Sequence, residues 1–204
     1  MKQNYIHPTA IVDSTVVLGE GNYIGPFCYI TGNTNIGNNN RFEGYCSIGT
    51  PAEHREYFYN TEGYLYIGDS NVFREYSSIN TGAISETRIG SNITLLTGAH
   101  VSHDCVLSDK ITLSHNAVLG GHSTVMEGVN LGIGAICHQY SILGAYAMVG
   151  MGSVVTKSSQ IIPGGIFVGA PAKYLKSNSI GLERNNITEE KLQEITNKYN
   201  SLLR

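Results

Sequence analysis

Tryptophan is absent from this 204-residue sequence, and charged residues make up only 14% of it. The formal net charge of −3 argues against the strongly basic surface that is typical of nucleic-acid-binding proteins. No run approaches the roughly 18 apolar residues of a membrane-spanning helix, and the opening MKQNYIHPTAIVDSTVV lacks the continuous apolar segment of a signal peptide. We therefore expect a soluble, cytoplasmic protein that binds neither nucleic acid nor a membrane.

Cysteine is also sparse, and its spacing fits no metal or redox motif. The four cysteines, Cys28, Cys46, Cys105 and Cys137, lie in no CxxC pair and show no zinc-ribbon spacing. In a cytosolic chain such residues are expected to be reduced thiols, most of them buried.

An apolar residue recurs at every sixth position. Steps of six lead from Ile6 to Ile48 and, after two interruptions, from Ile89 to Phe167. Neither an α-helix nor an ordinary strand produces this period. A parallel β-helix does, because each short strand sends one large side chain inward before the chain turns. The sequence therefore predicts an all-β fold, a left-handed parallel β-helix of about eight coils over residues 1–172.

The period is interrupted at residues 50–66 and 80–88, where additional residues are inserted. Insertions in a solenoid form loops on one face, which is often the binding face. These loops are either plain surface loops or part of a site, and His54 and Arg55 in the first loop favour the second interpretation.

The last segment, residues 173–204, does not follow the six-residue period. Its first part looks irregular, and ITEEKLQEITNKYNSLLR predicts one amphipathic α-helix. Thr188 is the expected N-cap, with two acidic residues in the first turn. The helix is expected to pack on a coil or on a neighbouring subunit.

Several segments resemble the hexapeptide-repeat acyltransferases, and among them the UDP-N-acetylglucosamine O-acyltransferases of bacterial lipid A synthesis. HPTAIVDSTVVLGEGNYIGPFCYI is similar to that family's opening coils, and GAHVSHDC is similar to its catalytic segment. GGHSTV, CHQYSILGAYAMVG and SIGLER resemble later parts of the same family. The resemblance implies a left-handed β-helix, a homotrimer, and active sites between subunits. The tail departs from it, because it predicts one helix where the family has a longer helical domain, and GAPAKYLK resembles a loop of acetyl-CoA-dependent acetyltransferases.

The resemblance makes His103 the general base. An acceptor hydroxyl or amine must lose a proton as it attacks a thioester carbonyl, and a neutral imidazole can accept that proton. Gly121 matches the residue whose backbone N–H stabilises the oxyanion of the tetrahedral intermediate. Asp104 follows His103 directly, and the alternation of side chains along a strand predicts that the two point apart.

The other residues that match family positions are expected to contact substrates. The resemblance assigns substrate contacts to His54, His100, His122, His138, Gln139, Met151, Asn178 and Arg184. The separate resemblance of GAPAKYLK to acetyl-CoA-dependent acetyltransferases implies that Lys173 contacts the CoA phosphates. A surface role explains His100 equally well. His54 stands where the family has an aspartate that faces the acceptor sugar. Met151 stands at the closed end of the family's acyl groove, where a large side chain favours a short acyl group.

The sequence therefore predicts an acyltransferase of lipopolysaccharide or O-antigen sugar biosynthesis. It would move a short acyl group, acetyl or another short or hydroxy acyl, from CoA or acyl carrier protein to a hydroxyl or amino group of a nucleotide-linked sugar. No metal and no permanently bound cofactor are expected. One alternative is a true UDP-N-acetylglucosamine 3-O-acyltransferase of lipid A synthesis.

Two alternatives from other classes stay open. A γ-class carbonic anhydrase would hold zinc on three histidines that include an H-x4-H spacing, but no two histidines here are five residues apart. A non-catalytic solenoid subunit would bind no CoA, acyl carrier or nucleotide sugar.

Overall fold

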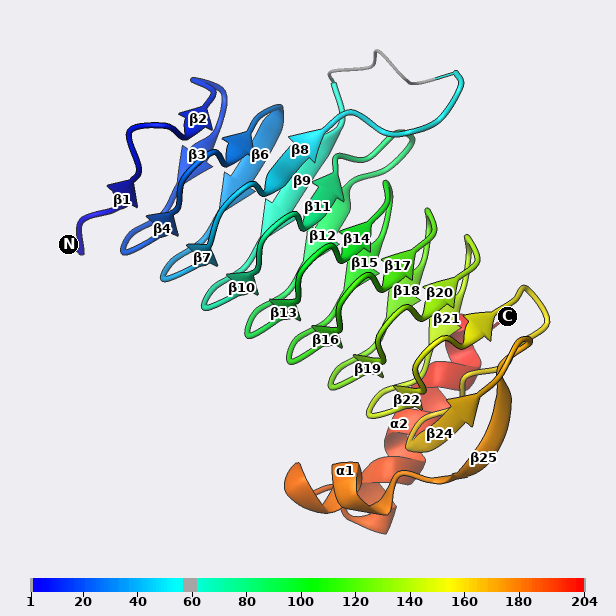
Figure 1. The fold of residues 1–204 in the computed structure, drawn as a ribbon. Helices are drawn as coiled ribbons and strands as arrows, with labels where there is room; N and C mark the ends of the chain where they lie inside the picture. Colours follow the sequence, from blue (N-terminus) through cyan, green and yellow to red (C-terminus); the bar gives the residue numbers. More distant parts are fainter. Residues whose placement is uncertain (1, 57–61, 204) are drawn as a thin grey trace.

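The computed structural model describes residues 2–56 and 62–203, which form a parallel β-helix followed by a C-terminal tail (Figure 1). Short strands wind around three faces, and strands one regular coil apart pair in parallel, as Val101 does with Leu119. One face stacks nine parallel strands, and the other two stack eight and seven. The predicted β-helix of about eight coils is confirmed.

The first face, face A, consists of β1 (Tyr5–Ile6), β4 (Tyr23–Ile24), β7 (Arg41–Phe42), β10 (Val72–Phe73), β13 (Thr94–Leu95), β16 (Thr112–Leu113), β19 (Asn130–Leu131), β22 (Met148–Val149) and β24 (Gly165–Val168), with β25 (Lys173–Ser177) added antiparallel to β24. Face B consists of β2 (Ile11–Val12), β5 (Tyr29–Ile30), β8 (Ser47–Thr50), β11 (Ser78–Asn80), β14 (His100–Val101), β17 (Val118–Leu119), β20 (Ile136–Cys137) and β23 (Val154–Val155). Face C consists of β3 (Val17–Leu18), β6 (Asn33–Ile36), β9 (Tyr64–Ile67), β12 (Thr87–Ile89), β15 (Val106–Leu107), β18 (Thr124–Val125) and β21 (Ile142–Leu143).

The six-residue period marks the core. From Ile24 to Phe167, the residues at the predicted inward positions are buried in one continuous apolar cluster. Ile6 in the first coil is instead 44% exposed, because no further coil covers that end of the solenoid. The four cysteines are buried and unpaired, as the sequence predicted.

Both insertions lengthen the chain between paired strands, and the parallel pairing continues on either side of them, with one register shift between Ile79 and Asn80 in β11. Ile36 pairs with Ile67 and Ile79 pairs with Val101, although each pair is separated by more than the regular 18 positions. The first and last residues of the two predicted insertions, 50–66 and 80–88, belong to strands. The first loop therefore joins β8 to β9, and the second joins β11 to β12. Residues 57–61 of the first loop lie outside the described residues.

The tail contains more regular structure than the sequence indicated. The segment expected to be irregular forms β25 and a short helix, α1 (Ser179–Arg184), before the predicted helix α2 (Glu189–Leu202). Strand β25 is stabilised by pairing with β24, and α1 is capped by Asn178, whose side chain also donates to the Tyr146 carbonyl (2.9 Å). The bond to Tyr146 spans 32 positions of the chain, whereas the β24–β25 pairing and the Asn178 cap are local and were missed by the sequence analysis.

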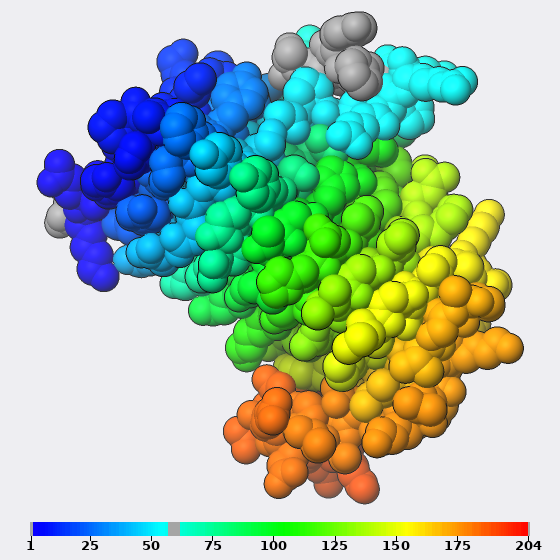
Figure 2. All heavy atoms as spheres, in the orientation of Figure 1, coloured from blue at the N-terminus to red at the C-terminus, as the bar shows by residue number. Residues whose placement is uncertain are grey.

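Helix α2 packs on the solenoid rather than extending away from it. Thr188 caps its N-terminus as predicted, accepting from the Lys191 N–H. Tyr199 is buried against Met126 and Tyr146 near the last coils. Figure 2 shows the tail gathered at the end of the solenoid opposite the N-terminus. No helix in the described residues is long and apolar enough to cross a membrane.

Candidate active site

The site lies along the corner between faces B and C, where the chain turns in each coil. Asp104, His122 and Tyr140 occupy equivalent turn positions 18 residues apart, and all three have a left-handed backbone, with φ between 58° and 62°. This conformation breaks the alternation that holds along an extended strand. Consecutive side chains at this corner can therefore point to the same side.

His103 and Asp104 form a hydrogen-bonded pair, which corrects the expectation that they point apart. Nδ1 of His103 lies 2.6 Å from Oδ2 of Asp104. The side chains are 9% and 0% exposed. A carboxylate at Nδ1 keeps the proton on that nitrogen and leaves Nε2 with a free lone pair. Nε2 is therefore the atom that can accept a proton from a substrate.

The second inserted loop holds Asp104 in place. Oδ1 of Asp104 accepts the backbone N–H groups of Ala83 (3.1 Å), Ile84 (3.1 Å) and Ser85 (2.6 Å), as well as the Ser85 hydroxyl (3.0 Å). Burial alone would raise the pKa of Asp104, but the hydrogen bonds from His103, Ser85 and Ile84 outweigh it and lower the pKa to about 2. Asp104 is thus ionised at neutral pH and fixed through its second oxygen.

We expect Ser85→Ala to lower kcat about 3- to 10-fold with little change in KM. The substitution removes one of the four donors to Oδ1, a loss of about 1 kcal/mol, and loosens the carboxylate that orients His103. Steady-state kinetics measure this. Ser85→Thr is the matched control because it keeps the hydroxyl. A Ser85→Ala enzyme with wild-type kcat would show that the loop does not position the pair.

Gly121 lies directly against the imidazole of His103. A Cβ added to Gly121 would lie 2.8 Å from both Cε1 and Nε2 of that ring, closer than any side chain tolerates. The Gly121 N–H donates to no backbone acceptor in the part of the chain that the structure describes. A backbone donor beside the base is suited to stabilise an oxyanion formed there, so the Gly121 N–H stays the candidate for this role.

Gly121→Ala is expected to lower kcat about 100-fold, because the new methyl group displaces the imidazole from its place. The matched control is Gly44→Ala, which alters another buried turn glycine whose nearest neighbour would lie 3.2 Å away. The measurement is kcat for both variants, with thermal unfolding to confirm that they fold. Equal activity of the two variants would contradict the assigned contact.

Two aromatic rings lie beside His103, and a third ring stacks on one of them. His122 lies edge-on to it at 5.1 Å between ring centroids, and His54 lies edge-on at 5.9 Å. Tyr140 stacks on His122 at 4.5 Å with the rings parallel. Burial lowers the pKa of His122, and although Asp104 raises it, His103 and His54 lower it further. His122 is therefore mainly neutral at pH 7 and can donate or accept a hydrogen bond.

The donor atoms of His103, Asp104 and His122 lie within 4.8 Å of one another, so these three residues could hold a divalent cation. The set consists of two histidines and a carboxylate, whereas the carbonic anhydrase alternative requires three histidines. The short bond between His103 and Asp104 is the arrangement of a general base with its orienting acid. The geometry therefore favours proton transfer.

His100 lies on β14, just before this corner. Its Nδ1 pairs with the Ser78 hydroxyl (2.8 Å) and its Nε2 with the Ser102 hydroxyl (3.1 Å). Burial lowers its pKa against an opposing effect of Glu53, so the ring is neutral at pH 7. His100 supports the wall of the site, and both of its nitrogens are occupied.

Comparisons with known proteins show the family of this chain. Residues 15–50 match the family described as bacterial transferase hexapeptide (six repeats). The chain is 32% identical to the acyl-(acyl-carrier-protein)–UDP-N-acetylglucosamine O-acyltransferase of Halorhodospira halophila and 34% identical to that of Syntrophobacter fumaroxidans, in each case over 98% of this chain and 84% of the relative. The chain belongs to the UDP-N-acetylglucosamine O-acyltransferase family. The resemblance noted in the sequence is thereby confirmed.

Solved structures of this family share the fold. The UDP-N-acetylglucosamine acyltransferase of Francisella novicida superposes with a TM-score of 0.81 at 27% identity, covering 95% of this chain and 78% of that chain. The enzyme of Moraxella catarrhalis gives 0.79 at 28% identity, over 95% and 82%. The family consists of acyltransferases that use a thioester donor, so this chain is an acyltransferase rather than a carbonic anhydrase or a non-catalytic subunit.

The other residues predicted from the acyltransferase resemblance do not join His103 within one chain. His138 and Gln139 are exposed at the next turn of the same corner. Met151, 76% exposed, lies on the corner between faces A and B, at the opposite edge of face B. The tail residues predicted to contact substrate or CoA lie beyond the last coil: Lys173, Asn178 and Arg184. Lys173 and Arg184 are exposed, whereas the two polar groups of the Asn178 side chain make structural hydrogen bonds with Tyr146 and Gly181.

Two residues of the site escaped the sequence analysis. Ser85 lies 18 positions before His103, and Tyr140 lies 18 positions after His122. The regular coil length, continued along this corner, could have identified Tyr140, whereas Ser85 lies in the second inserted loop, where the period is broken, and only the fold brings it to Asp104.

Proposed function

We propose that the protein transfers an acyl group from a pantetheine thioester to a hydroxyl or amino group of a UDP-linked amino sugar. The observation that carries this is the His103–Asp104 pair with Gly121 against its free nitrogen. The names of the relatives specify UDP-N-acetylglucosamine as acceptor and an acyl carrier protein as donor, so this pair of substrates is the first to test. The alternative drawn from the sequence, a true UDP-N-acetylglucosamine 3-O-acyltransferase, becomes the leading assignment of the acceptor.

The mechanism follows from the proton positions. The acceptor oxygen or nitrogen attacks the thioester carbonyl while Nε2 of His103 takes its proton. Asp104 stabilises the resulting imidazolium through Nδ1. The carbonyl oxygen becomes an oxyanion that the Gly121 N–H can receive. Collapse of the tetrahedral intermediate breaks the C–S bond, and the imidazolium returns its proton to the leaving thiolate.

A homotrimer would complete the site. Because Met151 and His103 lie at opposite edges of face B, one chain cannot place both against the same acyl group, whereas a second copy could. The outward positions of face B carry no formal charge and suit an interface: Ile11, Tyr29, Ser47, Ser78, His100, Val118, Ile136 and Val154. Met151 would then limit the groove to a short acyl group, and Lys173 and Arg184 would be available to the donor's phosphates.

A thiol-release screen tests this proposal. Acetyl-CoA, longer acyl-CoA and acyl carrier protein thioesters would be incubated with UDP-N-acetylglucosamine and its amino analogues, and products identified by mass. We expect acceptor-dependent thiol release with at least one pair. No release above the acceptor-free control for any pair would refute the proposed reaction.

A further inference from the structure

A buried carbonyl oxygen without a partner lies at the edge of the site. Asn80, at the end of β11, is 3% exposed. Its Nδ2 donates to the Thr50 hydroxyl and to the Pro51 carbonyl, both at 3.1 Å. These two bonds fix which way the amide faces, and Oδ1 is left with no hydrogen-bond partner among the described residues. A buried acceptor left unpaired costs about 1–3 kcal/mol, so it is expected to meet a partner in the working enzyme.

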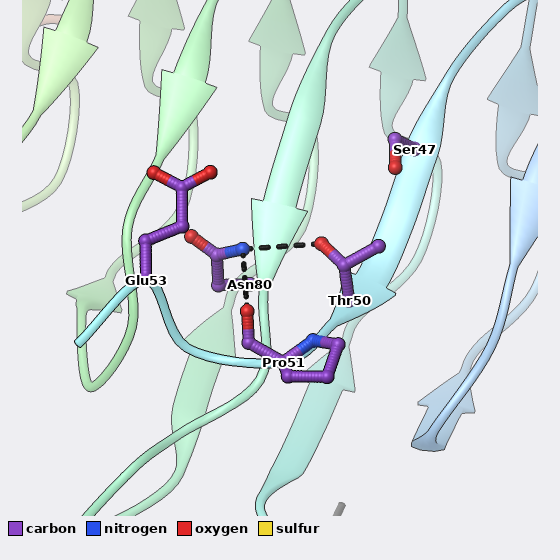
Figure 3. Close-up of a pocket in the computed structure, with 5 residues that line it drawn as sticks. All are labelled: Ser47, Thr50, Pro51, Glu53 and Asn80. Carbon is purple, nitrogen blue, oxygen red and sulfur yellow. Dashed lines mark hydrogen bonds between the residues drawn. The ribbon is translucent and has the colours of Figure 1, made fainter. Parts of the chain in front are cut away.

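Asn80 lines a cleft together with Ser47, Thr50, Pro51 and Glu53, with a volume of about 580 Å³. Figure 3 shows the Asn80 amide oxygen on the side of the amide that faces Glu53, with the two bonds from Nδ2 running to Thr50 and Pro51. The cleft has the size of a small-molecule subsite. It adjoins the base, because Glu53 directly precedes His54, whose ring lies 5.9 Å from that of His103.

The charges of the cleft select the kind of group that it can hold. Among the residues that the structure describes, its lining contains one carboxylate, that of Glu53, and neither lysine nor arginine. The nearby His100 is neutral at pH 7, and both of its ring nitrogens face serine hydroxyls. A carboxylate and an unpaired carbonyl attract hydrogen-bond donors and repel a phosphate.

We propose that this cleft binds a hydrogen-bond-donating group of the acceptor sugar, either an ammonium or neighbouring hydroxyls, and excludes its diphosphate. The proposal rests on the proposed function. Asn80 and Glu53 together present the acceptor oxygens that such a group requires. Hydrogen bonds from the group in the cleft to these oxygens hold the sugar in place. The reacting hydroxyl or amine of the sugar stays free to approach His103.

Calorimetric binding of UDP-N-acetylglucosamine and UDP-glucosamine, without any thioester, tests the proposal. We expect Asn80→Leu to weaken binding of at least one of these sugars tenfold or more. Glu53→Gln is a second test of the cleft in case Asn80→Leu disturbs the fold of the loop, because it changes an exposed side chain. If the bound group is an ammonium, Glu53→Gln weakens UDP-glucosamine at least tenfold and UDP-N-acetylglucosamine less than threefold. If the bound group consists of hydroxyls, Glu53→Gln weakens the binding of UDP-glucosamine and of UDP-N-acetylglucosamine to a similar extent.

The matched control is Glu56→Gln, which removes the same charge from the same loop outside the cleft. Wild-type affinities for both sugars in Asn80→Leu and Glu53→Gln would overturn the proposal. Tighter binding in Glu53→Gln would also overturn it, because it would place the diphosphate in the cleft. Since no acyl donor is present, binding that is lost in these variants supports the subsite even where the wild-type enzyme transfers no acyl group.

Discussion

His103→Ala is expected to lower kcat by about 10³–10⁴-fold. The variant keeps the oxyanion donor and the substrate contacts, but it removes the only group whose free nitrogen lies against Gly121 in the described site. General base catalysis contributes about 10²–10⁴-fold, and His103 must also return the proton to the leaving thiolate. The measurement is the initial rate of thiol release at saturating acceptor.

Two controls separate loss of the base from loss of the fold. His115→Ala changes an exposed histidine in the next coil and is expected to leave kcat unchanged. Added imidazole should restore part of the activity of His103→Ala, because the space beside Gly121 is vacated. Turnover within tenfold of wild type in His103→Ala would rule out the base assignment.

The core of this fold could be predicted because it depends on a repeated local requirement. Each coil buries one large apolar side chain per face, so the positions from Ile24 to Phe167 follow directly from the period. The two insertions were also visible as breaks in the period. Their exact ends were not, because β9 and β12 extend by pairing with neighbouring coils rather than by their own composition.

The sequence analysis named His103 and Gly121 as candidates but did not predict the geometry that pairs His103 with Asp104. Alternation separates neighbouring side chains only along extended backbone, and Asp104 has a φ of 58°. Asp tolerates this left-handed conformation better than most residues do, which is the local reason for its presence at the turn. The partners of its second oxygen come from a loop about 20 residues earlier, and only the folded coil brings them to Asp104.

In the tail, the resemblance assigned Asn178 to substrate binding, but its side chain makes structural hydrogen bonds. Asn178 donates to the Tyr146 carbonyl, accepts from Gly181, and thereby joins α1 to the last coils. The hydrogen bond to Tyr146 spans 32 positions of the chain, so the sequence motif around Asn178 does not reveal it. Motif matching cannot distinguish a residue that holds a helix from one that holds a ligand.

Asp104→Asn is expected to lower kcat by about 10²–10³-fold although the side chain keeps its shape. The loop donates four hydrogen bonds to Oδ1, so the amide must place its oxygen there and its Nδ2 opposite His103. An amide N–H facing Nδ1 moves the imidazole proton to Nε2, the atom that has to accept a proton from the acceptor. The ring then stays in place in the wrong tautomer. Steady-state kinetics give kcat, and ¹⁵N NMR of the histidines reports the tautomer directly.

The same substitution should change how stability depends on pH. The folded-state pKa of Asp104, about 2, lies below its unfolded value, so ionised Asp104 stabilises the fold above about pH 4 and loses this contribution as the pH falls toward 2. The full contribution is about 2 kcal/mol, and about half of it is lost between pH 7 and pH 3, a decrease that urea unfolding at these two pH values measures. In Asp104→Asn the decrease between these pH values should be smaller than in the wild type, whereas Asp109→Asn, at an exposed corner, should retain most of it. If Asp104→Asn retains wild-type kcat together with the wild-type decrease in acid, Asp104 neither orients His103 nor stabilises the corner as a carboxylate.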